Sequence, residues 1–289
     1  GDYIYTAGAF SASHEAVIVP EAVAQKERRP EQRRSDDSRV AHLHSPVDLN
    51  KGNMEFLIQH RFLGSVVRNG RLDTGSAFGV DFGANINLEI DYALTDRLSI
   101  GVSRARFDQL VEGRFSTGLV DFTANYELLT RSDSPWKFSL RGGIEGQENF
   151  ERHYSGFLEL ASQFDYRFVR TYVVPVVVLN SRRDEDARAR PEQAINPGDN
   201  HTFSLGVGVD LALSPRFSLV AEYVPRLAGF GGFGGERAAI TGGVKIRTWG
   251  HVFHILLSNS RVFTPSQYAV NATTTDYALG FNIYRRIGH

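Results

Sequence analysis

Residues Ala84–Leu94 read ANINLEIDYAL and alternate strictly between apolar and polar side chains. The apolar residues at every second position from Ile86 to Tyr92 would share one face, because successive side chains of a β-strand point to opposite faces. The same alternation recurs in VDFTANYEL, FSLGVGVDLAL and YALGFNI, at residues 120–128, 203–213 and 277–283. Each stretch is close to the length of a tilted strand that crosses a bilayer. The pattern predicts a transmembrane β-barrel.

The composition favours strands over helices and excludes several kinds of site. The chain of 289 residues contains 28 glycines, 20 phenylalanines and 11 tyrosines, but one methionine and no cysteine. Without cysteine there is no disulfide framework, thiolate metal site or covalent haem attachment, and we expect no cofactor. The formal net charge of −1 gives no field that would attract nucleic acid. The most apolar run, YVVPVVVL from Tyr172, is far shorter than the roughly 20 residues of a membrane-spanning helix.

From Lys51 onward the sequence predicts about twelve strands, whose connections alternate between short and long. The strand cores are expected at residues 53–63, 84–94, 98–107, 118–129, 136–145, 157–167, 169–180, 201–213, 217–225, 238–249, 251–259 and 276–286. In an outer-membrane barrel the short turns face the periplasm, so an even number of strands puts both chain ends in the periplasm. The predicted fold is therefore an all-β, antiparallel transmembrane barrel in the bacterial outer membrane, surrounded by its lipid.

The segment of residues 1–48 differs from the predicted barrel of residues 49–289. Its stretch QKERRPEQRRSDDSRV, residues 25–40, is charged and free of aromatic residues, so we expect it to remain solvated unless a partner orders it. We interpret residues 1–48 as a mostly irregular periplasmic extension that serves as a tether or docks an envelope protein. The candidates for that docking are Arg28, Arg29, Arg33 and Arg34. His42 and His44 follow in the motif HLH, and without a third ligand we interpret them as polar linker residues.

If the apolar strand faces meet lipid, the opposite faces line the lumen. The charged candidates for this lining are Glu55, Arg61, Glu89, Asp91, Asp121, Glu127, Lys137, Arg141, Asp210, Glu222, Lys245 and Arg247. Charges of both signs can pair across a barrel of this size or leave a narrow polar pore. The strand around Pro175 departs from alternation, since valines lie on both of its faces. We expect a bulge there and an inward apolar patch that contacts a loop or the N-terminal segment.

Large aromatic residues gather where the predicted strands meet the short turns. Amphipathic rings at this level form a belt at the membrane interface of barrels. The candidates for a periplasmic belt are Tyr92, Tyr126, Trp136, Trp249 and Tyr284.

A lipid hydrolase is an alternative, because a serine and histidine pair on the outer wall of a barrel is a known arrangement in a phospholipase. The residues that bear on it are His60, His201, His251 and His254, with Ser204 and Ser258 near one or another of them in sequence. No nucleophile elbow and no orienting Asn or Asp at a triad spacing accompanies them. We therefore expect no catalytic residues.

Two stretches carry a resemblance to a known family. VDLNKGNMEFLIQHRFLG at residues 47–64 and FGANINLEIDYALTDRLSIGVSRAR at residues 82–106 resemble bacterial outer-membrane β-barrels known only as a domain of unknown function. The similarity extends from about Val47 to the C-terminus, and its most specific features are QHRF and the DYALTDRLSIG turn. The resemblance implies a barrel in a Gram-negative envelope, without catalytic residues.

The leading hypothesis is a non-enzymatic outer-membrane barrel. It would act as a small, porin-like channel, or as an envelope anchor whose N-terminal tail binds a partner. A lipid hydrolase and a secreted, soluble β-sandwich that binds a ligand remain as alternatives. The sequence leaves open whether the barrel conducts or is plugged.

Overall fold

The computed structural model describes residues 2–5, 10–14, 37–46, 49–106, 110–111, 114–115, 118–129, 134–181, 200–231, 237–270, 272 and 274–288. The chain divides into two compact units, Gly1–Arg34 and Ser35–His289. In the first unit, β1 (Asp2–Tyr5) pairs antiparallel with β2 (Phe10–His14). Within the described residues, no helix has the length and apolar character needed to cross a membrane.

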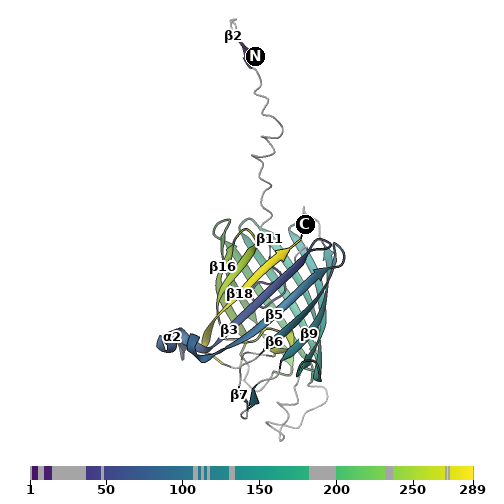
Figure 1. The fold of residues 1–289 in the computed structure, drawn as a ribbon, viewed down its shortest axis with the longest axis vertical. Coiled ribbons are helices and arrows are strands. Elements are labelled where there is room, and N and C mark those ends of the chain that lie inside the picture. The colour runs from purple at the N-terminus through teal and green to yellow at the C-terminus, as the bar shows by residue number, and fades with distance from the viewer. Residues whose placement is uncertain are drawn as a thin grey trace. The chain divides into compact units, whose positions relative to one another are not determined.

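The second unit is built on twelve long antiparallel strands. They are β3 (Met54–Arg68), β5 (Ala84–Ala93), β6 (Leu98–Arg106), β9 (Leu119–Leu129), β10 (Trp136–Gln147), β11 (Arg152–Tyr166), β12 (Val169–Leu179), β13 (Thr202–Ala212), β14 (Phe217–Val224), β16 (Ala239–Arg247), β17 (His251–Ser258) and β18 (Tyr277–Ile287). Each pairs with its neighbours in sequence, and β18 pairs with β3, so the sheet closes on itself (Figure 1). This confirms the predicted antiparallel barrel of about twelve strands. The β-sandwich alternative is wrong, because these strands form one closed sheet rather than two packed sheets.

Short elements decorate the ends of the barrel. Between β3 and β5 lie β4 (Arg71–Leu72), α2 (Gly75–Gly79) and the 3-10 helix η1 (Val80–Phe82). The remaining short strands are β7 (Leu110–Val111), β8 (Arg114–Phe115) and β15 (Arg226–Gly229). Helix α4 (Pro265–Tyr268) lies between β17 and β18.

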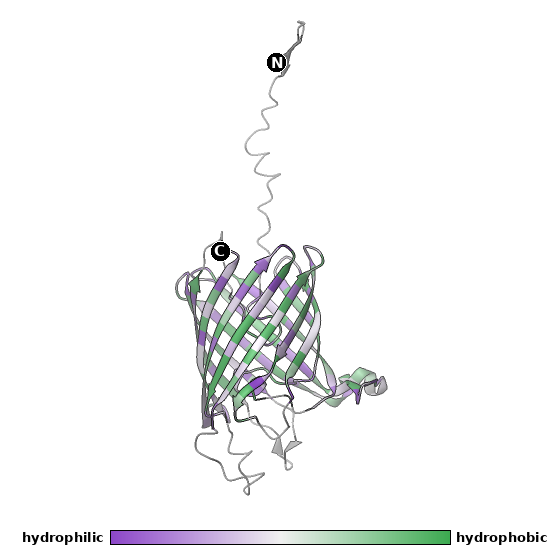
Figure 2. Ribbon diagram, turned by 180° about the vertical axis from the view of Figure 1, so that it is seen from behind, coloured by the Kyte–Doolittle hydropathy of each residue, from purple (hydrophilic) through white to green (hydrophobic). Residues whose placement is uncertain are grey.

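The two faces of the sheet have opposite character, as the alternation predicts. In β5 the outward Leu88 is 54% exposed, whereas the inward Glu89 is 4% exposed. Along the strands, apolar and polar residues alternate visibly (Figure 2). Closure gives each of the twelve long strands a hydrogen-bonded neighbour on both sides, which a sheet surrounded by lipid requires.

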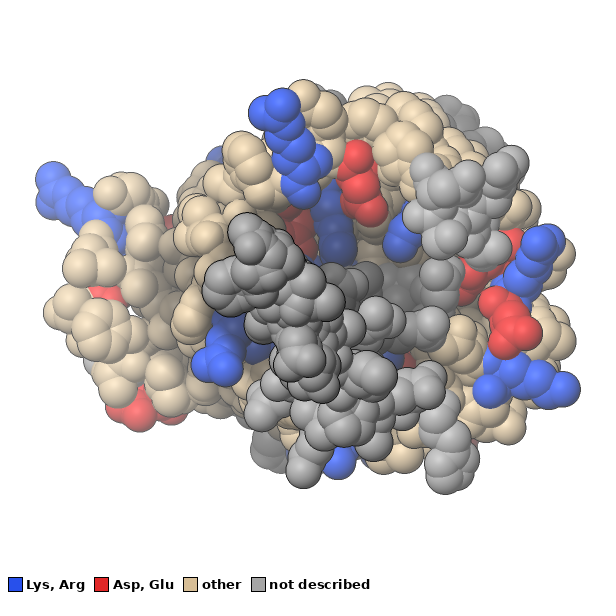
Figure 3. Space-filling view, turned by 90° about the horizontal axis from the view of Figure 1, so that it is seen from above, with Lys and Arg blue, Asp and Glu red and all other residues tan. Residues whose placement is uncertain are grey.

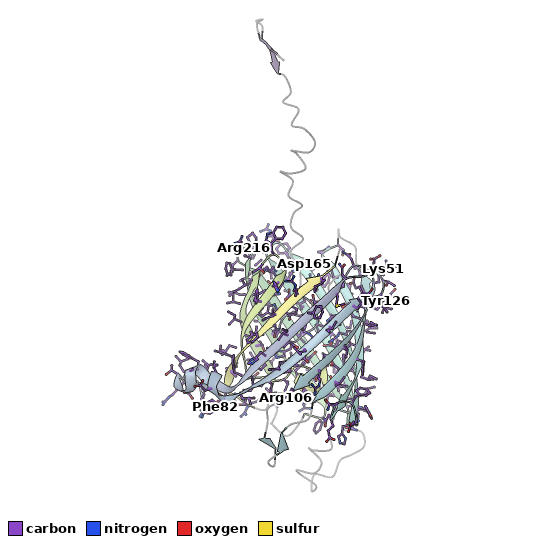
Figure 4. All side chains as sticks on the ribbon, viewed as in Figure 1. Lys51, Phe82, Arg106, Tyr126, Asp165 and Arg216 are labelled. Atoms are coloured by element: carbon purple, nitrogen blue, oxygen red, sulfur yellow. The ribbon has the colours of Figure 1, made fainter. Side chains whose placement is uncertain are left out.

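Tight turns lie at one end of the barrel, which we call the short-turn end, and the longer connections at the other, the long-loop end. Figure 4 labels Lys51, Asp165 and Arg216 at the short-turn end and Phe82 and Arg106 at the long-loop end. The C-terminus lies at the short-turn end (Figure 1).

Two of the tight turns use the same hydrogen bonds. The hydroxyl of Thr95 accepts the backbone N–H of Leu98 at 2.9 Å, and the hydroxyl of Ser214 accepts that of Phe217 at 3.1 Å. Side-chain acceptors of this kind favour a turn over a continuing strand.

The bulge expected at Pro175 is absent. Pro175 pairs with Leu205 of β13, and the register of that pairing runs unbroken from Val169 to Val178. On the other side, the recorded pairing with β11 passes from Val176 directly to Val173 without a register shift. The strand therefore accommodates the missing N–H by omitting ladder contacts locally.

Two outward leucines at different depths test the assignment of the outer face to lipid. Leu88 lies in the middle of β5, and Leu94 follows that strand at the short-turn end. In lipid vesicles we expect Leu88→Arg to lower the free energy of unfolding by about 2–4 kcal/mol and Leu94→Arg by about 0–1 kcal/mol, because the cost of a lipid-facing charge depends on depth. Urea titration of both variants measures this difference. Equal losses would contradict the assignment.

Candidate functional site

The inward faces of the strands carry a dense set of charged side chains. Of the predicted lumen residues, all except Asp91 and Lys137 are buried, and those two are partly exposed. The buried ones are Glu55, Arg61, Glu89, Asp121, Glu127, Arg141, Asp210, Glu222, Lys245 and Arg247. Figure 3 looks onto the short-turn end and shows side chains of both signs there.

Residues 37–46 lie inside the barrel as a small hairpin, which we call the lumen hairpin. The N–H of Ser45 donates to the carbonyl of Ser38 at 2.9 Å, and that of Val40 to the carbonyl of Leu43 at 2.9 Å. Every residue of the hairpin is buried. The prediction of a solvated run up to residue 40, and of a polar linker at the HLH motif, is therefore wrong for this part of the chain, because wall residues distant in sequence supply partners for its charges.

Glu222 of β14 binds the tip of the lumen hairpin. Its carboxylate accepts the backbone N–H groups of Ala41 at 2.6 Å, His42 at 2.9 Å and Leu43 at 2.9 Å. Successive N–H groups that converge in this way form an anion-binding concavity. Hydrogen bonds to an ionised acceptor are the stronger kind, so Glu222 is the main polar attachment of the tip.

Arg39 joins the hairpin to a chain of alternating charges on the wall. Its Nη2 lies 2.7 and 2.6 Å from the two carboxylate oxygens of Glu89. Glu89 also accepts from Nη2 of Arg141 at 2.8 Å, and Nη1 of Arg141 lies 3.4 Å from Glu159. Although burial alone would lower it, the neighbouring carboxylates raise the pKa of Arg39 above its usual value. The pairing keeps both partners charged.

Asp37 makes the corresponding contacts on the opposite part of the wall. Its carboxylate lies 2.8 Å from Nζ of Lys245 and 2.7 Å from Nε2 of His254. Lys245 and Arg247 both contact Asp210, at 2.8 and 2.9 Å. Burial alone would raise the pKa of Asp37, but Lys245 and His254 hold it well below its usual range.

The apolar side of the hairpin packs on the valine-rich strand β12. Leu43 belongs to one buried cluster with Val174 and Val176, and Val40 to another with Tyr172. Gly206 of β13 makes room for this packing, because a Cβ there would lie 2.3 Å from Leu43 Cδ2. The inward apolar patch expected on this strand is present, and the N-terminal segment covers it.

A second segment enters from the long-loop end. Residues 259–270, which we call the inward loop, contain α4, where the hydroxyl of Tyr268 donates to Glu159 and that of Ser266 to Glu145. The hydroxyl of Ser204 donates to the carbonyl of Ala269 at 2.6 Å. The ring of Tyr268 lies 6.1 Å from that of His42, so the loop and the hairpin meet inside the barrel.

Little space remains beside the lumen hairpin. A cavity of about 10 Å³ lies between the hairpin and the wall, which is room for about one water molecule. It is lined by Ser38, His44, Leu49, Glu89, Asp91, Ser99, Asn125 and Arg141. Among the described residues, the lumen hairpin, the inward loop and paired charges occupy the inside of the barrel around this cavity.

Four of the five candidates for the aromatic belt have exposed side chains. Tyr92, Tyr126, Trp136 and Trp249 are exposed, whereas Tyr284 is 1% exposed and lies inside the barrel, with its ring 4.9 Å from that of His254. Its assignment to the belt is wrong, because alternation in β18 puts it in phase with the inward Asn282 rather than with Phe281.

The serines considered for catalysis have other partners. Besides the bond of Ser204 to Ala269, Ser258 lies 2.6 Å from the hydroxyl of Thr241. The described part of the chain holds no cluster of three or more potential metal ligands. The docking candidates Arg28, Arg29, Arg33 and Arg34 lie outside the described residues.

The family described as "Membrane bound beta barrel domain (DUF5777)" matches residues 36–287. No curated protein matches the chain. Similar solved structures include the KdgM porin, at 8% identity and a TM-score of 0.48 over 82% of this chain and 99% of that chain. The outer membrane protein Omp33 of Acinetobacter baumannii has 9% identity and a TM-score of 0.46, over 82% and 99%. Outer membrane phospholipase A of Escherichia coli has 9% identity and a TM-score of 0.42, over 87% and 94%.

Acidification should loosen the lumen hairpin. Burial lowers the pKa of His42 and, further, that of His44, so the docked hairpin binds fewer protons than a released one with imidazole pKa values near 6.5. Docking of the hairpin is unaffected above about pH 6.5, the ordinary pKa of imidazole, and weakens as the pH falls below it. Protonation of Asp37 weakens docking as well, at more acid pH. The groups facing the two rings are Glu222, Arg61, Thr241, Asn125, Arg39 and Arg141.

Hydrogen exchange of residues 37–46, corrected for intrinsic rates, should rise as the pH is lowered from about 7.5 to about 5. In the double variant His42→Gln and His44→Gln we expect most of that dependence to disappear. An unchanged dependence in the double variant would assign it to other groups.

Proposed function

We propose that this chain, which belongs to the family of membrane-bound β-barrel domains, is a small outer-membrane channel that the lumen hairpin holds closed. The observation that carries the proposal is the way the charged wall pairs with the hairpin. Glu222, Glu89 and Lys245 each bind a group of residues 37–46.

Charged wall residues are energetically unfavourable in a lumen that is permanently dry, because their desolvation costs free energy. Replacing buried ion pairs by well-packed apolar residues is often neutral or stabilising, so such pairs are weak evidence for stability. The same residues are well suited to a lumen that contains water part of the time. A wall of this composition supports two states, one in which the hairpin satisfies the charges and one in which water does.

The inward loop sets the size of the open state. Its attachments to Glu145, Glu159 and Ser204 are all to the wall and would persist after the hairpin left. The remaining opening would be narrow and lined by charges of both signs. We therefore infer conduction of ions or small polar solutes rather than of large ones, and no enzymatic role.

We place the short-turn end in the periplasm. Short turns on that side and longer loops outside are the usual arrangement of outer-membrane barrels. The C-terminus then lies on the periplasmic side, and the lumen hairpin, which begins at Asp37, enters the barrel from that side. The absence of cysteine allows a direct test with Arg216→Cys in a short turn. A membrane-impermeant maleimide should label it only after the outer membrane is permeabilised. Labelling in intact cells would reverse the orientation.

Conductance in planar bilayers tests the closed channel. The wild-type protein should be silent for most of the recording. Glu222→Ala removes the acceptor of three N–H groups and should raise the open probability roughly 10- to 100-fold, the equivalent of losing about 1.5–3 kcal/mol of charge-assisted bonding. Glu222→Gln should lie between the two. Glu145→Ala, which removes one attachment of the inward loop and leaves those of the hairpin in place, is the matched control.

A reversible lock makes this test specific for the hairpin. A Cβ added at Gly208 would lie 3.4 Å from Val40 Cγ1, so the wall and the hairpin are immediate neighbours here. The cross-link to introduce is therefore a disulfide between Val40→Cys and Gly208→Cys. Combined with Glu222→Ala, the oxidised protein should be silent and the reduced protein should conduct. If every variant stays silent while retaining heat-modifiable gel mobility, the channel is excluded and the envelope-anchor role becomes the better explanation of the N-terminal extension.

A further inference from the structure

We propose that residues 71–82, which we call the arm, lie in the lipid headgroup boundary of the membrane leaflet next to the long-loop end. The arm comprises β4, α2 and η1. In Figure 1 it projects sideways from the wall of the barrel instead of continuing along the strands, with α2 at its outer end. An element that projects sideways from the end of a membrane-spanning barrel lies along the membrane surface.

The arm is seated on the wall by backbone packing. A Cβ at Gly64 of β3 would lie 2.3 Å from the Cα of Gly79, and one at Gly79 would lie 2.4 Å from the carbonyl carbon of Gly64. Gly79 also has φ +81°, a conformation that favours glycine. The N–H of Asp73 donates to the carbonyl of Val66 at 2.7 Å. These contacts hold the arm against β3, so its direction is a property of the fold.

The arm exposes large apolar side chains. The exposed fractions are 67% for Leu72, 47% for Phe78, 41% for Val80 and 57% for Phe82. A short segment that exposes four large apolar side chains is unfavourable in water, and such patches mark interaction surfaces. Figure 2 shows the helix of the arm as predominantly hydrophobic.

This apolar surface continues into the face of the barrel that meets lipid. Four residues after Phe82, Ile86 begins the outward row of β5, followed by Leu88. Figure 4 labels Phe82 where the arm meets the foot of the barrel. Because the arm extends an existing lipid interface, lipid is the occupant that fits it without a further assumption.

The charged residues at the base of the arm match the headgroup level. Arg68, at the end of β3, lies 3.5 Å from Asp73 and 4.0 Å from Asp276, and Arg71 is exposed beside it. They border an open depression of about 660 Å³. The arm itself carries Arg71, Asp73 and Asp81, so charges of both signs stand beside its apolar side chains. An apolar helical segment flanked by charged residues suits an interfacial anchor, with apolar residues in the acyl boundary and charged groups at the headgroup level.

Spin labels on single cysteines test the arm directly, since the chain contains no other cysteine. The full-length protein is reconstituted in phosphatidylcholine vesicles containing phosphatidylglycerol, with labels at Phe78→Cys or Phe82→Cys. References are Leu158→Cys on the outward face of β11, for lipid, and Arg216→Cys in a short turn, for water. The readout is the accessibility of each label to oxygen relative to a water-soluble nickel complex.

We expect the two arm sites to show a several-fold higher ratio of oxygen to nickel accessibility than Arg216→Cys, approaching Leu158→Cys. Gly64→Ala, which forces the backbones of β3 and the arm apart, should reduce that ratio while the barrel keeps its heat-modifiable mobility. Nickel accessibility equal to that of Arg216→Cys would overturn the proposal. So would spin–spin broadening between labelled copies, which would assign the arm to a second copy of this chain.

Discussion

The constraint on which the structure depends is that a backbone in lipid must satisfy its own hydrogen bonds. An open sheet leaves two edges unpaired, and the pairing of β18 with β3 removes both. Closure has a second consequence, because it encloses the side chains on the inner face of the sheet, which are half of those on the strands. In this chain most of those side chains are polar, so the closed barrel creates a second problem, which is how to satisfy buried charge away from bulk water.

The lumen hairpin solves that problem with groups matched to the wall. Its tip presents three backbone N–H groups to Glu222, its arginine meets Glu89, and its aspartate meets Lys245 and His254. Each contact joins residues at least 50 positions apart in sequence, so the binding site for the hairpin exists only where the barrel brings these wall residues together. The inward loop meets the same hairpin through Tyr268, which places the closure of the lumen at the junction of two segments that are not strands.

The strands could be predicted from the sequence because alternation depends on local residues. The stretch quoted from Ala84 to Leu94 became β5, Ala84–Ala93, with its polar residues inward. Tyr284 departs from the prediction because its position in the alternation of β18 points its ring inward, whatever its aromatic character. The burial of Arg39 and His42 could not be predicted from the residues around them, because their partners lie on strands far along the chain. The feature of the sequence that indicates a buried partner is an inward wall with more charge than its own strands neutralise.

The central claim is that Glu222 holds the hairpin tip inside the lumen. Hydrogen exchange of the Ala41, His42 and Leu43 amides, measured at neutral pH in lipid vesicles, tests it most directly. The wild-type amides should exchange as slowly as those of the neighbouring strands, and those of Glu222→Ala much faster while the strand amides stay protected. Rapid exchange of the three amides in the wild-type protein would show that the hairpin does not occupy the lumen, and would contradict the account.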